Sequence, residues 1–424
     1  MIMDVLAKME KMPERRAETI LAHGGLPDLR EKRARTFVKK VEKEFLELPP
    51  EKYQYGGTAG PSVAREAISE YLQNLGANIK SEDIVLCAGG AQNALAAFAH
   101  DAERKKKKVL TTDPFYTGIS ALTDKLVLVN LNKKFQIDEN EVEKCLKRGG
   151  VEYFYIISPG NPDGTVKKNI KELVELGERY EVKVIIDAAY TGIFEGAGDP
   201  YSEYVELLNT AENFAIIGTL SKSGWMPGAR TGIVITRSRE LKDVFTSYFS
   251  SHTLFPGTGA YYAYILFREG GKLIREGAAL QREISLYRLK KLHRAVSEKV
   301  KEAVGEKYVK LPPKETLGGF FLWLGFPGVR REILVKRLKK DEEFLKNYRE
   351  LMGSEPAFWD KSTSELISHA LLNKKFGKYV AVAPGSGFSR RPEPYIRIAA
   401  CYLNDREIEE VAEALASFLT YATN

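Results

Sequence analysis

Short apolar runs that alternate with helix-like segments occupy the chain from about residue 62 to residue 235 and restrict its possible folds. Segments between the runs, such as 169–180, have apolar residues three and four positions apart, as amphipathic helices do. Continuously apolar strands separated by helices are typical of a mostly parallel sheet with helices on both faces. We therefore predict an α/β fold with a mostly parallel, seven-stranded sheet sandwiched by helices. The expected strands are IVLCA (84–88), VLTT (109–112), LVLVNL (126–131), YFYIIS (153–158), VKVIID (182–187), FAIIGTL (214–220) and RTGIVIT (230–236).

The pattern changes near residue 300, after a long amphipathic stretch at 269–305. Two later segments, 318–326 and 395–402, resemble antiparallel strands, and 405–422 has helical periodicity. We predict a large domain at 51–299. A smaller α+β domain would form from the two termini, residues 1–50 and 300–424.

Composition and charge exclude several classes of protein. No run of about 18 apolar residues is present, so we expect no membrane span. The N-terminal stretch lacks the apolar core of a secretory signal, which favours the cytoplasm. Three cysteines and five histidines show no metal-ligand spacing, so we expect no metal. The basic run at 104–108 contains no aromatic residues, so we interpret it as a solvated helix end and expect no nucleic-acid partner.

Polar and small residues stand where several runs end, and ligands of parallel sheets bind at that edge. Gly89, Gly90 and Ala91 follow the first run, where backbone N–H groups at a strand-to-helix turn can hold a phosphate. A rigid turn that presents Asn161 follows the fourth run. Asp187 closes the fifth run, and a carboxylate there is costly to bury without a partner. We interpret it as functional, with a helix cap as the alternative.

Lys222 follows the sixth run and stands among small residues, unlike a lysine on a solvated face. Its amine would lie near the phosphate turn and Asp187, a setting in which lysines serve as Schiff-base nucleophiles. Arg230, eight residues further on, could form a bidentate pair with a phosphate. These positions predict a reactive lysine beside a phosphate site.

The motifs around these residues resemble those of the fold-type I pyridoxal-phosphate enzymes in the class I/II aminotransferase group. Residues 219–232 resemble the family's S-x-S-K-x(5)-G-x-R-x-G, with Thr219 in place of a common serine. Asp163 stands where the family usually has threonine, and residues 327–380 match poorly. Further matches, in the family's order, are G-x-P-D at 25–28, YGGTAG at 55–60, GAQ at 90–92, PFY at 114–116, P-x-N-P-x-G at 159–164, D-x-x-Y at 187–190, PGSGF at 384–388 and YIRI at 395–398.

The resemblance implies an aminotransferase that uses pyridoxal 5′-phosphate to move an amino group from an amino acid to pyruvate or 2-oxoglutarate. Lys222 would hold the cofactor as an aldimine and move the proton that leads to a pyridoxamine intermediate. Asp187 would keep the ring nitrogen protonated, and Tyr190 would hydrogen-bond the ring's 3-oxygen. The implied cofactor-binding residues are Tyr55, Gly90, Ala91, Gln92, Tyr116, Asn161, Asp187, Tyr190, Thr219, Ser221, Lys222 and Arg230.

The resemblance also implies how substrates and a partner subunit bind. Gly25, Asn161 and Arg397 would bind substrate, with Arg397 holding the α-carboxylate; the alternative for Arg397 is a plain position on a strand face. A homodimer with shared active sites is expected, in which Tyr55 reaches the partner's phosphate.

The sequence predicts less about the side chain of the substrate. Phe115, Trp225 and Phe388 stand beside the motifs and would either favour an apolar or aromatic substrate or serve as ordinary packing. The segments 220–232 and 318–324 resemble the valine–pyruvate branch of the family.

Two other functions use the same features. A pyridoxal-phosphate lyase or decarboxylase would need the same lysine and aspartate. A non-enzymatic regulator with an aminotransferase-like domain would need a DNA-binding domain first, and the two dozen residues before Gly25 are too few for a winged helix.

Overall fold

The computed structural model of the chain describes residues 12–54, 56–254, 256–352, 359–391 and 394–423. The chain divides into two compact units. The larger unit comprises Leu26–Asn161 and Thr165–Ile284. The smaller unit comprises Met1–Gly25, Pro162–Gly164 and Ser285–Asn424.

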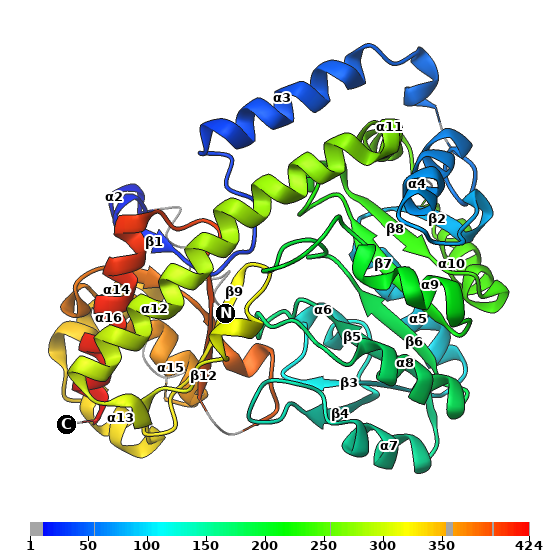
Figure 1. Ribbon diagram of the computed structural model, residues 1–424. Coiled ribbons are helices and arrows are strands. Elements are labelled where there is room, and N and C mark those ends of the chain that lie inside the picture. Colours follow the sequence, from blue (N-terminus) through cyan, green and yellow to red (C-terminus); the bar gives the residue numbers. More distant parts are fainter. Residues whose placement is uncertain (1–11, 55, 255, 353–358, 392–393, 424) are drawn as a thin grey trace. The chain divides into compact units, whose positions relative to one another are not determined.

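These units differ from the expected domain boundaries at 50/51 and 299/300. Helix α3 (Lys32–Leu46) lies alongside α11 (Thr258–Gln281) in Figure 1. Lys40 on α3 forms an ion pair with Glu276 on α11 at 2.6 Å. Because α3 also buries Phe37, Val41 and Phe45, this N-terminal segment belongs with the larger unit.

A seven-stranded sheet flanked by helices forms the centre of the larger unit (Figure 1), as the apolar runs predict. Its strand order is β2-β8-β7-β6-β5-β3-β4, and every neighbouring pair is parallel except those that involve β8. The strands are β2 (Ile84–Ala88), β3 (Lys108–Asp113), β4 (Leu126–Asn130), β5 (Val151–Ile157), β6 (Lys183–Asp187), β7 (Phe214–Thr219) and β8 (Thr231–Ile235).

The helices of the larger unit connect these strands and bury an apolar stripe each. Helix α8 shows the pattern: Leu173, Val174 and Leu176 are buried, and charged residues separate them. Such a stripe packs on the sheet and leaves the opposite face to water. Besides α3 and α11, the helices are α4 (Ser62–Asn74), α5 (Ala91–Arg104), α6 (Thr117–Ser120), α7 (Glu139–Lys147), α8 (Ile170–Arg179), α9 (Val205–Thr210) and α10 (Arg239–Ser251).

The smaller unit contains a three-stranded antiparallel sheet, as residues 318–326 and 395–402 predict. Strand β12 (Tyr395–Ala399) lies between β11 (Ala383–Pro384) and β9 (Phe321–Gly325), and Arg397 is paired with Trp323. A separate parallel pair joins β1 (Thr19–Leu21) to β10 (Tyr379–Ala381).

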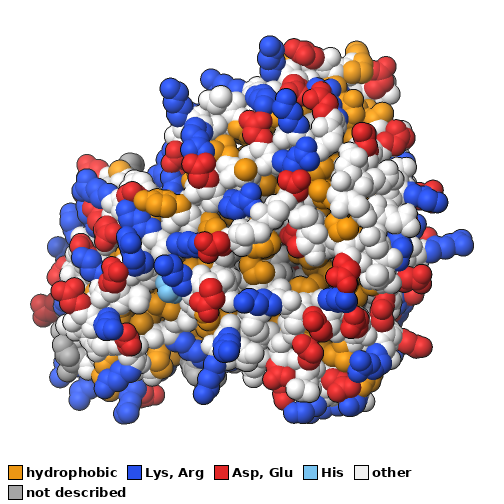
Figure 2. Space-filling view, in the orientation of Figure 1, with side chains coloured by type: hydrophobic (Ala, Val, Ile, Leu, Met, Phe, Trp, Pro, Cys, Tyr) orange, Lys and Arg blue, Asp and Glu red, His pale blue; other side chains and the backbone are white. Residues whose placement is uncertain are grey.

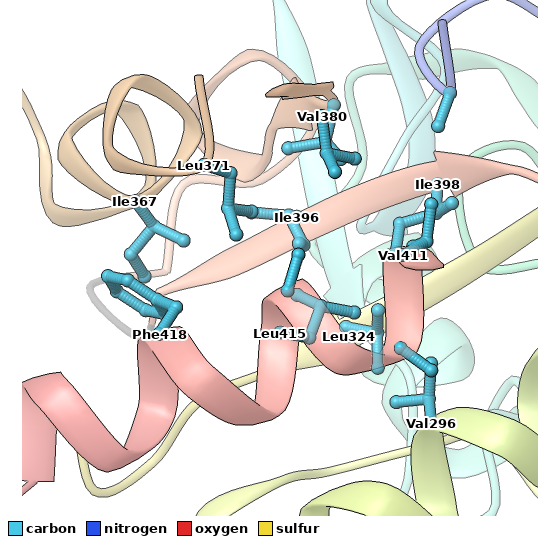
Figure 3. Close-up of a cluster of buried hydrophobic side chains, with 14 of the residues drawn as sticks. Val296, Leu324, Ile367, Leu371, Val380, Ile396, Ile398, Val411, Leu415 and Phe418 are labelled. Carbon is cyan, nitrogen blue, oxygen red and sulfur yellow. The ribbon is translucent and has the colours of Figure 1, made fainter. Parts of the chain in front are cut away.

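Helices cover the sheet of the smaller unit and share one apolar core with it. Figure 3 shows Leu324, Ile396 and Ile398 of the sheet facing Val411 and Leu415 of α16. The helices are α2 (Pro13–Glu18), α12 (Tyr287–Ala303), α13 (Arg331–Leu338), α14 (Glu342–Met352), α15 (Thr363–Ala370) and α16 (Asp405–Thr423).

The basic run at 104–108 lies where α5 ends and β3 begins, as expected for a helix end. Its Lys105 forms ion pairs with Asp101, Glu152 and Glu240. On the face drawn in Figure 2, lysine and arginine side chains alternate with aspartate and glutamate. In the part of the chain that the structure describes, no helix is both long and apolar enough to cross a membrane.

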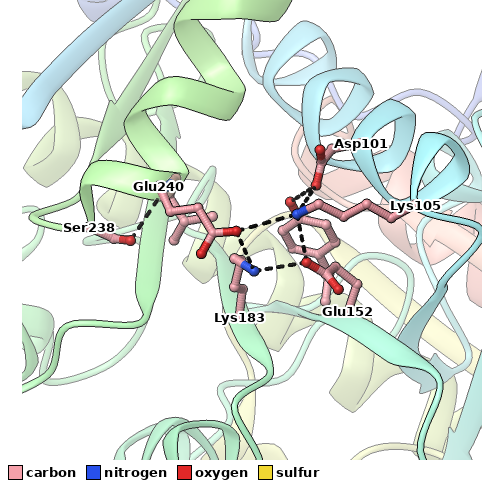
Figure 4. Close-up of polar contacts among 8 residues, drawn as sticks. Asp101, Lys105, Glu152, Lys183, Ser238 and Glu240 are labelled. Carbon is pink, nitrogen blue, oxygen red and sulfur yellow. Dashed lines mark hydrogen bonds and ion pairs between the residues drawn. The ribbon is translucent and has the colours of Figure 1, made fainter.

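An ion-pair network links the elements around Lys105 and Lys183 in the larger unit (Figure 4). Lys183 Nζ lies 2.8 Å from Glu152 and 3.0 Å from Glu240, and Lys105 Nζ lies 2.8 Å from the same Glu152 oxygen. The Lys183 side chain is only 8% exposed, so its charge depends on these carboxylates. The network therefore ties β5 and β6 to α5 and α10.

Substitution of Lys183 by methionine should destabilise the protein. Loss of a partner from a buried ion pair costs about 3–5 kcal/mol, and because Lys105 still pairs with Glu152 we expect a smaller loss, about 2 kcal/mol. Denaturant unfolding measures this loss. The matched substitution Lys144→Met removes the exposed pair with Glu141 and should leave stability unchanged. Equal effects of the two substitutions would contradict the role of the network.

Candidate active site

Five parallel strands and one antiparallel strand bring functional side chains to one edge of the large sheet. The carboxyl ends of β2, β3, β5, β6 and β7 lie at this edge because these strands run in one direction. Strand β8 runs the opposite way, so its first residues lie at the same edge, with Gly232 opposite Thr219. Arg230, just before β8, therefore lies near the end of β2.

A tight turn between β2 and α5 forms the first part of the site. Gly90 precedes Ala91, the first residue of α5, and has φ +75°, which disfavours any side chain. Its N–H donates to Arg230 O at 2.9 Å, and a Cβ on Gly90 would lie 3.2 Å from Arg230 Nη2. Gly90 thus lets the Arg230 guanidinium lie over the start of α5, where free N–H groups attract anions.

Arg230 itself adopts an uncommon backbone conformation, with φ 48° and ψ 42°. Its exposed guanidinium donates to Gly89 O at 2.6 Å and to Pro227 O at 3.2 Å. A non-glycine residue in this region of φ and ψ is often found at functional sites. The two carbonyl contacts hold the cation in place while leaving it open to an anion.

Two hydroxyl groups lie at the end of β7, beside this turn. Thr219 Oγ1 and Ser221 Oγ are 3.0 Å apart, and both side chains are buried. Thr219 Oγ1 also donates to Thr231 O at 3.1 Å, which ties β7 to the start of β8. The hydroxyls, the α5 N-terminus and Arg230 together offer the neutral and cationic donors that a phosphate needs.

Asp187 ends β6 as a buried carboxyl group, 3% exposed. Tyr155 Oη donates to its Oδ2 at 2.8 Å, and the Ala189 N–H donates to its Oδ1 at 3.0 Å. Burial raises the pKa of Asp187 to about 6, although both hydrogen bonds and the Lys222 charge act in the opposite direction. No helix begins here, so Asp187 does not cap one.

Lys222 lies in the loop between β7 and β8, half-buried, with Nζ 5.7 Å from the centre of the Tyr190 ring. Ser223 Oγ donates to Thr191 O at 2.7 Å, which joins the Lys222 loop to the loop that carries Tyr190. The Lys222 charge also lowers the pKa of Asp187. The lysine, the tyrosine and the aspartate therefore lie in one group.

Tyr116, Gln92 and Asn161 also lie in the larger unit, after β3, in α5 and after β5. Tyr116 Oη donates to Gln92 Oε1 at 3.2 Å, which links the end of β3 to the first turn of α5. Asn161 follows β5 and is 6% exposed. The turn after it belongs to the smaller unit, where the Gly318 N–H donates to Gly164 O at 2.9 Å.

Arg397 and Gly25 lie close together in the smaller unit. The Arg397 guanidinium carbon lies 4.2 Å from the Phe321 ring centre and 4.5 Å from that of Phe388, and Nη2 donates to His23 O at 2.6 Å. A Cβ on Gly25 would lie 2.4 Å from the Phe321 ring. Two rings and a carbonyl thus fix the guanidinium plane.

Some residues singled out in the sequence have other surroundings. Trp225 is 1% exposed and its Nε1 donates to Gly277 O at 2.8 Å, so it packs in the interior, as Phe115 does at 2% exposed. Tyr55 lies outside the described residues. The sequence does not single out Tyr155, because its hydrogen bond to Asp187 depends on the register of β5 and β6.

Comparison with known proteins gives the family. A family model described as aminotransferase class I and II matches residues 18–415. The chain belongs to this family. An aspartate aminotransferase of Pyrococcus horikoshii is 26% identical over 369 residues, which cover 84% of this chain and 80% of the relative.

Solved aminotransferases share the fold. Aspartate aminotransferase from Thermus thermophilus with maleate superposes with a TM-score of 0.71 at 17% identity, covering 98% of this chain and 95% of that chain. An aromatic aminotransferase from Pyrococcus horikoshii gives 0.70 at 21% identity, covering 96% and 98%. The protein is therefore an aminotransferase of the fold type I class, a family that generally depends on pyridoxal phosphate.

The chemistry of this sheet edge fits pyridoxal phosphate. Gly90 keeps the start of α5 open beneath Arg230, as a phosphate requires. The buried Asp187 carboxyl group lacks enough donors to keep its usual pKa, so a cationic ring nitrogen would offset part of its burial. Among the described residues, no cluster of three or more His, Cys, Asp or Glu side chains is suited to hold a metal ion.

The pKa of Asp187 predicts a pH dependence of stability in the cofactor-free protein. Its pKa rises from 3.8 to about 6 on folding, so the protonated carboxyl group stabilises the folded state. This contribution to the unfolding free energy is fully present below pH 4 and is lost as the pH rises through 6. Relative to Asp187→Asn, the wild type should lose about 2 kcal/mol of unfolding free energy between pH 4 and pH 7. Denaturant unfolding at several pH values measures it, and a pH-independent difference would argue against a buried carboxyl group.

Proposed function

We propose that Lys222 holds pyridoxal 5′-phosphate and that this aminotransferase passes the amino group of an amino acid to pyruvate or 2-oxoglutarate. The observation that carries the proposal is the grouping of the Lys222 amine with the buried Asp187 carboxyl group at one sheet edge. When bound, the cofactor supplies an aldehyde that condenses with amines and a protonated ring that withdraws electrons from the substrate.

The phosphate would bind at the turn between β2 and α5. Gly90 would leave room for it, because its own N–H donates to Arg230 O, and the Ala91 N–H would donate to it. The hydroxyls of Thr219 and Ser221 would turn from Thr231 O and from each other to donate to it, and Arg230 would supply the positive charge. Gln92 would assist from the first turn of α5, where it also holds Tyr116. Tyr55 would reach the phosphate of the partner subunit.

The ring would lie between these groups and Asp187. The Asp187 carboxylate would pair with the ring nitrogen and keep it protonated, because an adjacent anion favours the charged form. Asn161 and Tyr190 would hydrogen-bond the ring's 3-oxygen, and Tyr116 would stack on the ring. The hydrogen bond between Tyr116 and Gln92 would keep the Tyr116 ring in one orientation.

Lys222 would carry the proton that moves in the reaction. As a free amine, its Nζ would take the proton from the substrate Cα and return it at C4′. The Ser223–Thr191 hydrogen bond fixes the loop on which Lys222 stands, and so limits the distance that Nζ must travel.

The substrate carboxylate would bind to Arg397. Phe321 and Phe388 stack on the guanidinium, and the His23 carbonyl accepts from Nη2. These contacts preorganise a planar fork for a bidentate pair with a carboxylate. Gly25, beside the Phe321 ring, and Asn161 would complete the substrate contacts.

A homodimer with shared active sites is part of the proposal. In the larger unit, Leu46 is 71% exposed and Tyr53 is 65% exposed, and both adjoin Phe45, whose ring meets that of Tyr53. Large apolar side chains exposed together are typical of surfaces that bind another protein. The cytoplasmic location stays a prediction.

The half-reaction tests the function. An amino acid added alone to the cofactor-loaded enzyme should yield one equivalent of 2-oxo acid per site, with a change in cofactor absorbance and no ammonia. Lys222→Ala should slow this step by at least about 100-fold, because the proton carrier is lost. Lys299→Ala, on the exposed face of α12, is the control. Release of ammonia with pyruvate would favour a lyase instead.

Arg397→Lys should weaken substrate binding without weakening cofactor binding. A lysine cannot form the planar bidentate pair, and loss of charge-assisted hydrogen bonds costs about 2 kcal/mol, so KM should rise about 30-fold for both the amino acid and the oxo acid. Steady-state kinetics measure KM, and Arg406→Lys is the control. An unchanged KM would mean that Arg397 does not bind the substrate carboxylate and is a plain position on a strand face.

A further inference from the structure

Tyr155 lies inside the sheet, two residues before the end of β5. Its side chain is fully buried, and its ring centre lies 5.9 Å from that of Phe98 on α5. In the β5–β6 register, Tyr155 is opposite Ile185 and Ile157 is opposite Asp187. Because side chains two apart share a face, Tyr155 and Asp187 are diagonal neighbours.

The contact between them has a fixed direction. Tyr155 Oη lies 2.8 Å from Asp187 Oδ2 and acts as donor, since an ionised carboxylate can only accept. The Ala189 N–H donates to the other carboxylate oxygen, Asp187 Oδ1. Donation to both oxygens sets the plane of the carboxylate and favours its ionised form.

The other titratable groups around Asp187 come from three further segments. Lys222 lies in the loop after β7 and Tyr190 follows β6. Tyr204 lies in the short helix Ser202–Tyr204, and Tyr201 lies just before it. Of these, only Lys222 lowers the pKa of Asp187, and cofactor attachment would use its amine. The two hydrogen bonds to the carboxylate would then remain.

We infer that Tyr155 is a positioning residue that keeps Asp187 ionised and turned toward the ring nitrogen of the bound cofactor. The inference rests on the proposed function. It means that strand β5, through Tyr155, would contribute to cofactor binding in addition to the site residues in the loops. Tyr155 acts only through Asp187.

The same strand offers a matched control. Tyr153 is also buried, and its hydroxyl donates to Asp101 Oδ2 at 2.6 Å. Asp101 lies in the network around Lys105, among residues that form no part of the proposed site. Tyr153→Phe thus removes a buried tyrosine–aspartate hydrogen bond without touching Asp187.

The experiment titrates cofactor-free wild type, Tyr155→Phe and Tyr153→Phe with pyridoxal 5′-phosphate at several pH values. Tyr155→Phe should bind about tenfold more weakly at neutral pH, since hydrogen bonds to charged groups contribute about 1.5–3 kcal/mol. The pH below which affinity falls should also move up from about 6, because the pKa of Asp187 rises when a donor is lost. Tyr153→Phe should bind as the wild type does.

A second ligand separates positioning from general disturbance of the site. A cofactor analogue with carbon in place of the ring nitrogen cannot pair with Asp187, so wild type and Tyr155→Phe should bind it equally. Thermal unfolding of each cofactor-free variant shows that it is folded.

Each result has one meaning. Equal affinities of Tyr155→Phe and Tyr153→Phe for the natural cofactor would overturn the role of Tyr155. A tenfold loss that persists with the analogue would overturn it too, since the effect would not pass through Asp187. Failure of the wild type to bind the cofactor would instead overturn the proposed function.

Discussion

Burial of the Asp187 carboxyl group at the end of β6 imposes a free-energy cost that the groups around it partly offset. Tyr155 and the Ala189 N–H donate to its two oxygens, and the Lys222 charge stabilises the ionised form. The remaining cost is a reason for the site to bind a cation. In the proposed function a protonated ring nitrogen would supply that cation, so binding of the cofactor would also relieve this cost.

The direction of one strand brings the opposite charge to the same edge. If β8 were parallel to its neighbours, Arg230 would lie at the far end of the sheet from Lys222. Because β8 is antiparallel to both β2 and β7, Arg230 lies over Gly90 at the start of α5. The sheet thus places the turn proposed to bind a phosphate and a buried carboxyl group at the same edge, an arrangement suited to a ligand with a phosphate and a basic ring nitrogen.

Local patterns in the sequence predict much of this arrangement. Continuous apolar runs identify all seven strands of the large sheet, since burial on both faces removes polar alternation. Charged residues at strand ends, such as Asp187 and Lys222, can be identified from the sequence as candidate site residues, because burial of a charge next to an apolar run costs free energy. The register of the strands and the packing of the helices cannot be predicted from such local patterns. Tyr155 resembles any apolar strand residue until β5 is aligned with β6, and α3 joins the larger unit through its contacts with α11.

In the proposed function Lys222, and none of the other lysines of this chain, holds the cofactor. Borohydride reduction of the cofactor-loaded protein, followed by proteolysis and mass spectrometry, locates the attachment directly. We predict the added mass on the peptide that contains Lys222, and on no other lysine, in stoichiometric amount. Stoichiometric modification of another lysine, such as the buried Lys167 or Lys183, with Lys222 unmodified would contradict the account.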